Sequence, residues 1–399
     1  MRLAPLVLPM VAAFGAALAQ AGPTHDTPRP AELDDPCVDA SCKRHALDAF
    51  RDALAAAKAG TASHALRVSY FGDSVTADDH LTEGLRHRLQ ALVGDGGPGF
   101  VFAAPPHPYC QHRAVARAVS DGWAAYGIST VVPPDHLLGL GGSAETDGGG
   151  TIRFAPRGPV NAIDVHYLAQ PHGGRLEIVA DGRVVASVAT AADRKQGAFL
   201  AAELPDGAKH LELRAHGRVR LFGATLEAKT GAVVDNLGVV NATAKAMRTN
   251  DLDEHLRNQL AHRAPDLVVV MYGTNEAEWL HARGAGMAEH EQLFGELLQT
   301  VRDANPDASC LVVSPLDQLD WRDDKLPPRD SIPAMVEAQR RAAAAHGCAF
   351  WDVYAWMGGK GASASWYKRG LVVKDYQHPT TEGAELIADA LYRGLVGDR

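Results

Sequence analysis

Three residues of this 399-residue chain have types and spacing that could cleave an ester. Ser74 follows an apolar run in FGDSVTADD, and near the C-terminal end DYQHPTTEG places Asp375 three residues before His378. A serine becomes a nucleophile when a histidine takes its proton, and a carboxylate holds that histidine in the correct tautomer. Because one short loop could present both Asp375 and His378, we predict that these residues form a catalytic triad with Ser74.

Ester cleavage also needs hydrogen-bond donors for the oxyanion. Asn275 follows the apolar run DLVVV in MYGTNEAE, and its amide could donate, although an Asx turn or a helix cap would use it equally well. Ser74 taken alone would be interpreted as a helix N-cap, and His378 is one of 18 histidines. The prediction therefore requires that separate strand ends converge. Neighbouring Asp73 and Glu276 are given no catalytic role, and the chemistry requires no metal or organic cofactor.

The elements that must position these residues follow an α/β pattern. An apolar run of strand length, residues 66–72, ends at the Gly-Asp-Ser turn, and residues 81–93 follow with apolar side chains at helical spacing. Strand-like and helix-like segments alternate again from about residue 232 onward. We predict a doubly wound parallel sheet of about five strands, with Ser74 and Asn275 at its carboxyl edge, where ligands bind in such folds.

Residues 110–230 have a different character, with short alternating segments separated by Gly-rich turns. Asp181 and Gly182 stand between two alternating runs and indicate a hairpin. We predict an inserted β-sandwich-like domain and interpret GGSAETDGGG, residues 141–150, as a loop. Three aromatic side chains could stack on sugar rings, although such residues more often pack in a core: Trp123, Tyr126 and Tyr167.

The motifs, in their order, resemble blocks I, III and V of the SGNH (GDSL-like) hydrolases: GDS, then GTNE, then DxxH. The resemblance covers roughly residues 66–109 and 232–395. It implies the flavodoxin-like SGNH hydrolase fold, with Ser74 as nucleophile and with its N–H and the Asn275 side chain as oxyanion donors.

Block II departs from the family pattern. In DNLGVVNATA, Asn241 stands where the family usually has the oxyanion-hole glycine, and Gly238 lies three residues earlier. The family uses the backbone N–H of that residue, so Asn241 could still donate. Asparagine also tolerates a left-handed backbone better than most residues.

Three longer stretches are similar to bacterial SGNH proteins that carry an inserted β-domain, among them peptidoglycan O-acetylesterases: GDGGPGFVFAAPP, HYLAQPHGGRLEIVADG and WYKRGLVVKDYQHPTTEG. This similarity implies an esterase that removes acetyl groups from peptidoglycan or another polysaccharide. Three alternatives remain open: acyl transfer to a sugar hydroxyl, a lipase-like preference for longer acyl chains, and a non-catalytic glycan-binding protein. The presence of all three triad residue types argues against the last.

The first residues, 1–21, place Arg2 before an apolar run that ends in small residues, and they predict a signal peptide and export to the periplasm or beyond. Pro5 and Pro9 interrupt the run, which argues against a stable membrane anchor. Residues 22–45 are rich in proline and acidic side chains and predict a flexible lead segment.

The rest of the chain divides into a hydrolase domain, residues 46–109 and 231–399, around the insertion. The formal charge of −9 argues against a broad basic surface for nucleic acid, although a local basic patch is compatible with it. Two of the five cysteines, Cys37 and Cys42, stand close together, and the sequence leaves open whether they are bridged. The others lack metal-ligand spacing, and buried packing is the expectation for Cys310 and Cys348.

Overall fold

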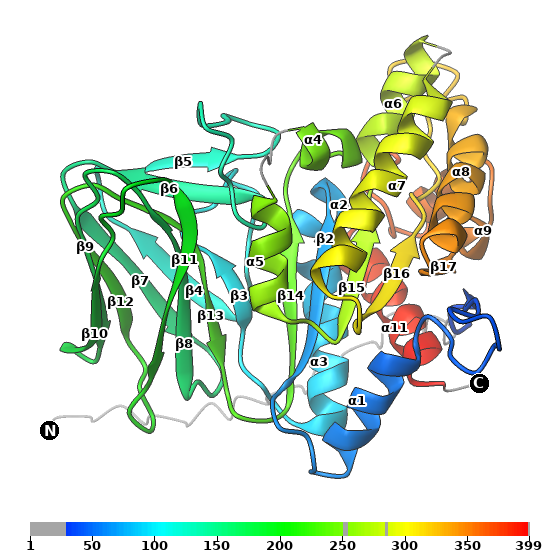
Figure 1. The fold of residues 1–399 in the computed structure, drawn as a ribbon. Coiled ribbons are helices and arrows are strands. Elements are labelled where there is room, and N and C mark those ends of the chain that lie inside the picture. The colour runs from blue at the N-terminus through cyan, green and yellow to red at the C-terminus, as the bar shows by residue number, and fades with distance from the viewer. Residues whose placement is uncertain (1–28, 250–253, 284–285, 398–399) are drawn as a thin grey trace, which may run out of the picture.

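The computed structural model describes residues 29–249, 254–283 and 286–397. The chain forms an α/β half and a half of antiparallel strands, which lie side by side in Figure 1. The predicted signal peptide lies outside the described residues. Among the residues that are described, no helix combines the length and the apolar character needed to cross a membrane.

The α/β half is built on one central sheet. Its strands follow the order β1 (Leu33–Asp34), β17 (Ala349–Trp351), β16 (Ser309–Val313), β15 (Leu267–Met271), β2 (Leu66–Gly72) and β14 (Ala232–Gly238). All pairs are parallel except that of the short edge strand β1 with β17. Residues of β15 alternate between the two faces, and all are buried. Burial on both faces explains why this strand is a continuous apolar run in the sequence.

Helices cover both faces of the sheet. One layer consists of α1 (Asp48–Lys58), α3 (His80–Val93) and α11 (Thr381–Val396), and the other of α5 (His255–Arg263), α7 (Met287–Ala304) and α8 (Ser331–Ala345). Shorter helices follow strand ends or lie in connections: α2 (Ser74–Ala77), α4 (Ala244–Thr249), α6 (Thr274–Arg283), α9 (Val353–Met357) and α10 (Ala362–Lys368).

The second half consists of two antiparallel sheets that enclose a common core. One sheet has the order β10 (Arg183–Ala189), β9 (Arg175–Ala180), β12 (Leu211–His216), β7 (Gly150–Pro156) and β4 (Val115–Val119). The other has the order β11 (Gln196–Glu203), β8 (Ala162–Ala169), β13 (Val219–Glu227), β6 (Gly142–Thr146) and β5 (Ala124–Gly127), and β3 (Gly99–Phe102) also pairs with β13. The sandwich therefore includes a strand that precedes residue 110.

The hairpin expected at Asp181 and Gly182 is present. These two residues join β9 to β10, both have positive φ angles of 46° and 83°, and Ala180 pairs with Arg183. A two-residue connection with positive φ at both positions matches the twist of the flanking strands. Tyr167 is buried in the core between the sheets, with 6% of its surface exposed, so it cannot offer a stacking face.

The expectation of a loop over residues 141–150 is wrong for its first part. Residues 142–146 form β6, which pairs with both β5 and β13. The side chain of Ala144 is fully buried between the sheets. Composition indicated a loop because it is rich in glycine, but strand formation depends strongly on the partners that the fold supplies. Part of the predicted lead segment is also ordered, since β1 pairs with β17.

The cysteines form two disulfides in the described residues. Cys37 is bonded to Cys42, which answers the question left open by the sequence. Cys310 and Cys348 are buried as expected, but they are not simple packing residues, because they are bonded to each other. Cys310 lies on β16 and Cys348 directly precedes β17, which pairs with β16, so their Cα atoms come within 4.6 Å. Cys110 is free and buried.

A buried carboxylate joins the two halves. Asp235 on β14 accepts hydrogen bonds from the Ser69 hydroxyl at 2.7 Å, from the Phe100 backbone N–H at 2.7 Å and from the Arg263 guanidinium at 2.8 and 2.9 Å. Phe100 belongs to β3 of the sandwich sheet, whereas the other partners belong to the α/β half. Burial alone would raise the pKa of Asp235, but the charge and hydrogen bonds of Arg263 hold it below its usual value.

Candidate active site

Ser74 lies at the turn between β2 and the short helix α2. Asp73 caps this helix by accepting a hydrogen bond from the Val75 backbone N–H at 2.9 Å. The helix packs closely on two paired strand ends, Gly72 of β2 and Gly238 of β14. A Cβ at either glycine would come within 2.4 Å of the Thr76 hydroxyl oxygen. These glycines therefore allow α2 to lie directly on the sheet edge, with Ser74 half-buried above it.

The structure brings Ser74, His378 and Asp375 together. Ser74 Oγ lies 2.8 Å from His378 Nε2, and His378 Nδ1 lies 2.7 Å from Asp375 Oδ2. The loop that carries the last two residues is compact, because Asp375 Oδ1 accepts the backbone N–H groups of Gln377 and His378, each at 3.0 Å. Tyr376 takes a left-handed conformation within it, with φ of 57°. The serine, the imidazole and the carboxylate thus form one hydrogen-bonded chain.

The electrostatics of this chain favour proton transfer to the histidine. Burial would lower the pKa of His378, but the hydrogen bond and the charge of Asp375 raise it above its usual value. Burial would likewise raise the pKa of Asp375, yet its hydrogen bonds to His378 and to the backbone N–H groups lower it. Asp375 therefore stays ionised and stabilises the imidazolium that forms when His378 accepts a proton.

Asn275 and Asn241 lie on neighbouring segments at the same sheet edge. Asn275 is in the first turn of α6, directly after β15, and its side-chain Nδ2 donates to the backbone carbonyl of Ala242 at 2.9 Å. An amide carries two N–H groups, so a second donor is left for another acceptor. Asn241 has the left-handed backbone that its residue type tolerates, with φ of 63°.

Glu276 has a supporting contact that the sequence did not reveal. It is buried, and its Oε1 accepts the backbone N–H of Ala244 at 2.9 Å. Asn275 and Glu276 thus bind the backbone of Ala242 and Ala244. Burial, with a smaller effect from the charge of Asp73, raises the pKa of Glu276 to about 7. The acidic residue after Asn275 was the available signal, but sequence does not tell in which direction it points.

Two groups of described side chains have ligand atoms close enough to hold a metal ion: Asp164, His166 and His262, and Cys37, Cys42 and His45. In the second group the cysteines are bonded to each other. In the first, His262 Nε2 is 2.6 Å from Asp164 Oδ2, and the His262 ring stacks on Phe199. Through these contacts α5, which carries His262, is joined to β8 and, by way of Phe199, to β11 of the sandwich. Neither of the two groups contains a residue of the predicted triad.

Comparison with known proteins relates part of the chain to a hydrolase family. Residues 204–386 match the model of the GDSL-like lipase/acylhydrolase family. The matched range includes Asn275, Asp375 and His378, and the structure adds Ser74, which precedes it, through its hydrogen bond to His378. Over this range, and in the residues of its site, the chain is similar to the GDSL-like acylhydrolases.

The chain shares its fold with a solved peptidoglycan O-acetylesterase. The two are 24% identical, the TM-score is 0.75, and the similarity covers 87% of this chain and 95% of that one. A catalytic mutant of an acetylxylan esterase from Geobacillus stearothermophilus is 17% identical with a TM-score of 0.31, over 41% of this chain and 73% of that one. Among curated proteins, a 4-coumarate–CoA ligase of Halorhodospira halophila is 32% identical over 81 residues, 20% of this chain, and the chain spans only 21% of that relative's length.

Proposed function

We propose that this protein is an exported serine esterase that removes O-acetyl groups from a polysaccharide, with peptidoglycan as the first candidate. The observation that carries the proposal is the hydrogen-bonded chain from Ser74 through His378 to Asp375. The shared fold with a peptidoglycan O-acetylesterase supports the choice of substrate class. The two disulfides support export, because such bonds persist in oxidising compartments.

In this mechanism His378 Nε2 accepts the proton of Ser74 as its Oγ attacks the ester carbonyl carbon. The resulting oxyanion accepts hydrogen bonds from the Ser74 backbone N–H and the Asn275 amide, with Asn241 offering a further backbone N–H. The sugar hydroxyl then leaves with the proton from His378, which leaves an acetyl group on Ser74. Water, deprotonated by the same histidine, releases acetate and restores the serine.

The proposal is tested by acetate release from acetylated peptidoglycan, acetylated xylan and nitrophenyl acetate. Replacing the nucleophile, Ser74→Ala, should lower kcat by at least about 10⁴-fold, because no acyl-enzyme can form and only the oxyanion donors and substrate binding remain. Ser187→Ala, at an exposed position on β10, is the matched control and should retain activity.

The substrates separate the alternatives. Faster turnover of the peptidoglycan would support the proposed role, and faster turnover of nitrophenyl esters with long acyl chains would support a lipase. Acetyl groups that reappear on an added sugar would identify a transferase. Binding of glycan by both proteins without any acyl release would overturn the proposal in favour of a glycan-binding protein.

A further inference from the structure

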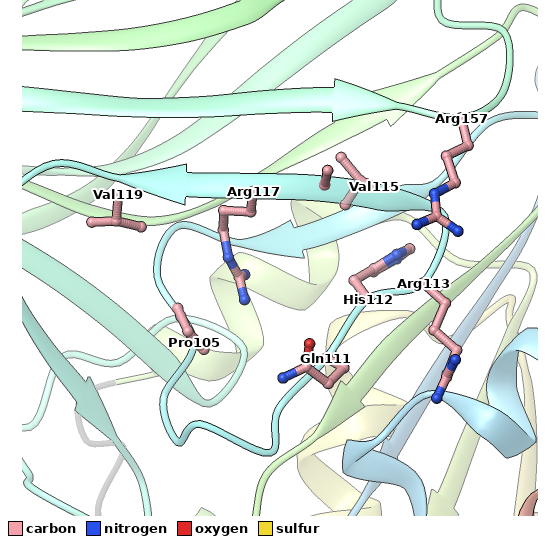
Figure 2. Close-up of a pocket in the computed structure, with 9 residues that line it drawn as sticks. Pro105, Gln111, His112, Arg113, Val115, Arg117, Val119 and Arg157 are labelled. Carbon is pink, nitrogen blue, oxygen red and sulfur yellow. The ribbon is translucent and has the colours of Figure 1, made fainter.

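A cavity of about 710 Å³ lies where the sandwich meets the α/β half (Figure 2). Its wall consists of β4 and the segment before it, together with Pro105 and Arg157. Three of the lining side chains are arginines, and none of the described residues that line it is acidic: Arg113, Arg117 and Arg157. The cavity is therefore locally basic, although the chain as a whole carries a charge of −9.

Two of these arginines have no carboxylate partner among the described residues. Arg117 donates to the backbone carbonyl oxygens of Phe102 at 2.6 Å and Cys110 at 3.5 Å. Burial lowers the pKa of Arg117 to about 10, which is the effect of a cation held out of water without a neutralising anion. Arg157 is exposed, and within the described part of the chain its side chain takes part in no ion pair. An anion in the cavity would neutralise both.

His112 adds a neutral donor to the same wall. Only 9% of its surface is exposed, and neither ring nitrogen has a hydrogen-bond partner in the described structure. The nearest carboxylate oxygen, Asp79 Oδ2, is 3.9 Å from Nδ1, and Asp79 is already bonded to Arg86. Burial, together with the charge of Arg86, lowers the pKa of His112 to about 4, so the ring is neutral and carries one N–H. A buried unpaired polar group is costly unless a ligand satisfies it.

The cavity wall is attached to the segment that carries Ser74. The Gln111 backbone N–H donates to the carbonyl of Ala77, the last residue of α2, at 2.8 Å. The Arg113 guanidinium donates to the carbonyl of Asp78, the next residue, at 3.3 Å. The cavity wall and the turn that carries Ser74 are thus held together by hydrogen bonds, and a polymeric substrate is the kind of ligand that could contact both.

We propose that this cavity binds a carboxylate of the polysaccharide substrate, with Arg117 and Arg157 as its charged partners and His112 as a neutral donor. The inference rests on the proposed function and deepens it, because it names the substrate as an acidic glycan. The carboxylate belongs to a sugar unit near the acetylated one, either as a uronic acid or as an acid substituent on the ring. Guanidinium groups bind carboxylates through paired N–H donors.

The test compares one acetylated polyuronate with the same polymer after its carboxyl groups have been reduced to alcohols, at equal acetyl content. The quantity measured is the ratio of kcat/KM for acetate release from the acidic polymer to that from the neutral one. We expect the wild-type protein to prefer the acidic polymer by about tenfold, and we expect Arg157→Gln to lose most of that preference through KM. Arg183→Gln removes the same charge from an exposed position on β10 and should keep the wild-type ratio.

Equal rates on both polymers, or equal loss of preference in the two variants, would overturn the inference. So would hydrolysis of nitrophenyl acetate without action on either polymer. These outcomes differ from failure of the proposed function, in which the wild-type protein releases acetate from none of the esters. A second variant, Arg117→Lys, keeps the charge but not the paired donors and should give an intermediate ratio.

Discussion

In the proposed mechanism, the protonation of a single residue, His378, sets the pH range in which Ser74 can react. Only the neutral imidazole accepts the serine proton, and Asp375 raises the pKa of His378 despite its burial. We therefore expect kcat/KM for nitrophenyl acetate to fall as the pH decreases through that pKa. In Asp375→Asn the carboxylate charge is lost, so the acid limb should move to lower pH while kcat falls by about 10⁴-fold. A pH–rate profile of both proteins measures this, and an acid limb that does not move would assign it to another group.

Sequence was informative about residues where spacing limits geometry. Asp375 and His378 are three residues apart, so a single loop could be expected to hold both, and they are hydrogen-bonded at 2.7 Å. The hydrogen bond from Ala244 to Glu276 could not be predicted, because its two partners are 32 residues apart and no pattern connects them. The same holds for Arg117 and Arg157, since each is one arginine among many until the fold places them at one cavity.

At the scale of elements, the position of α2 depends on the absence of a side chain beneath it. A methyl group at Gly238 would lie 2.4 Å from Thr76 Oγ1 and 2.6 Å from the Ala77 backbone nitrogen. Gly238→Ala should therefore displace α2, destabilise the protein by about 1–3 kcal/mol and lower kcat by about 10²-fold, because Ser74 moves with the helix. Thermal unfolding and ester hydrolysis measure the two effects. At Gly148 an added methyl group meets nothing within 4 Å, so Gly148→Ala is the control, and equal losses in both variants would contradict the argument.

Helices and strands with a clear apolar pattern in the sequence could be predicted. Strands that form only because a neighbouring strand pairs with them could not. Residues 66–72 and 267–271 are buried strands, as their apolar runs indicate, because a covered parallel sheet imposes that composition. Strand β6 was not predicted, because its glycine, serine and alanine residues have little intrinsic preference for strands. The disulfide between Cys310 and Cys348 depends on the pairing of β16 with β17, and that pairing is a property of the sheet.

At the scale of the whole molecule, the buried carboxylate of Asp235 is hydrogen-bonded to residues of both halves. Removing it would leave Arg263 with Glu227, at 2.7 Å, as its remaining carboxylate partner and would leave the Phe100 N–H unpaired. We expect Asp235→Ala to reduce the free energy of unfolding by about 3–5 kcal/mol, measured by urea denaturation. Asp206→Ala, an exposed carboxylate in the sandwich, should change it by less than about 0.5 kcal/mol. Similar values for the two variants would show that the buried contact is not critical.

The sequence pattern changes near residue 110, but the join between the two halves could not be predicted from that change. Strand β3 precedes that change and still pairs with β13 of the sandwich. Its sequence, GFVF, is equally suited to either half, and only the availability of β13 as a partner decides between them.

The sheet order also constrains when a growing chain can become reactive. Strand β2, which precedes Ser74, pairs only with β14 and β15 in the described sheet, and neither begins before residue 232. Contacts so distant along the chain form late, because the intervening segment must first be closed into a loop. The serine therefore has no fixed position until the whole sandwich, which ends at Glu227, has been synthesised. It meets His378 only after about 150 further residues. The proposed nucleophile is thus among the first parts of the molecule to be made and among the last to become competent.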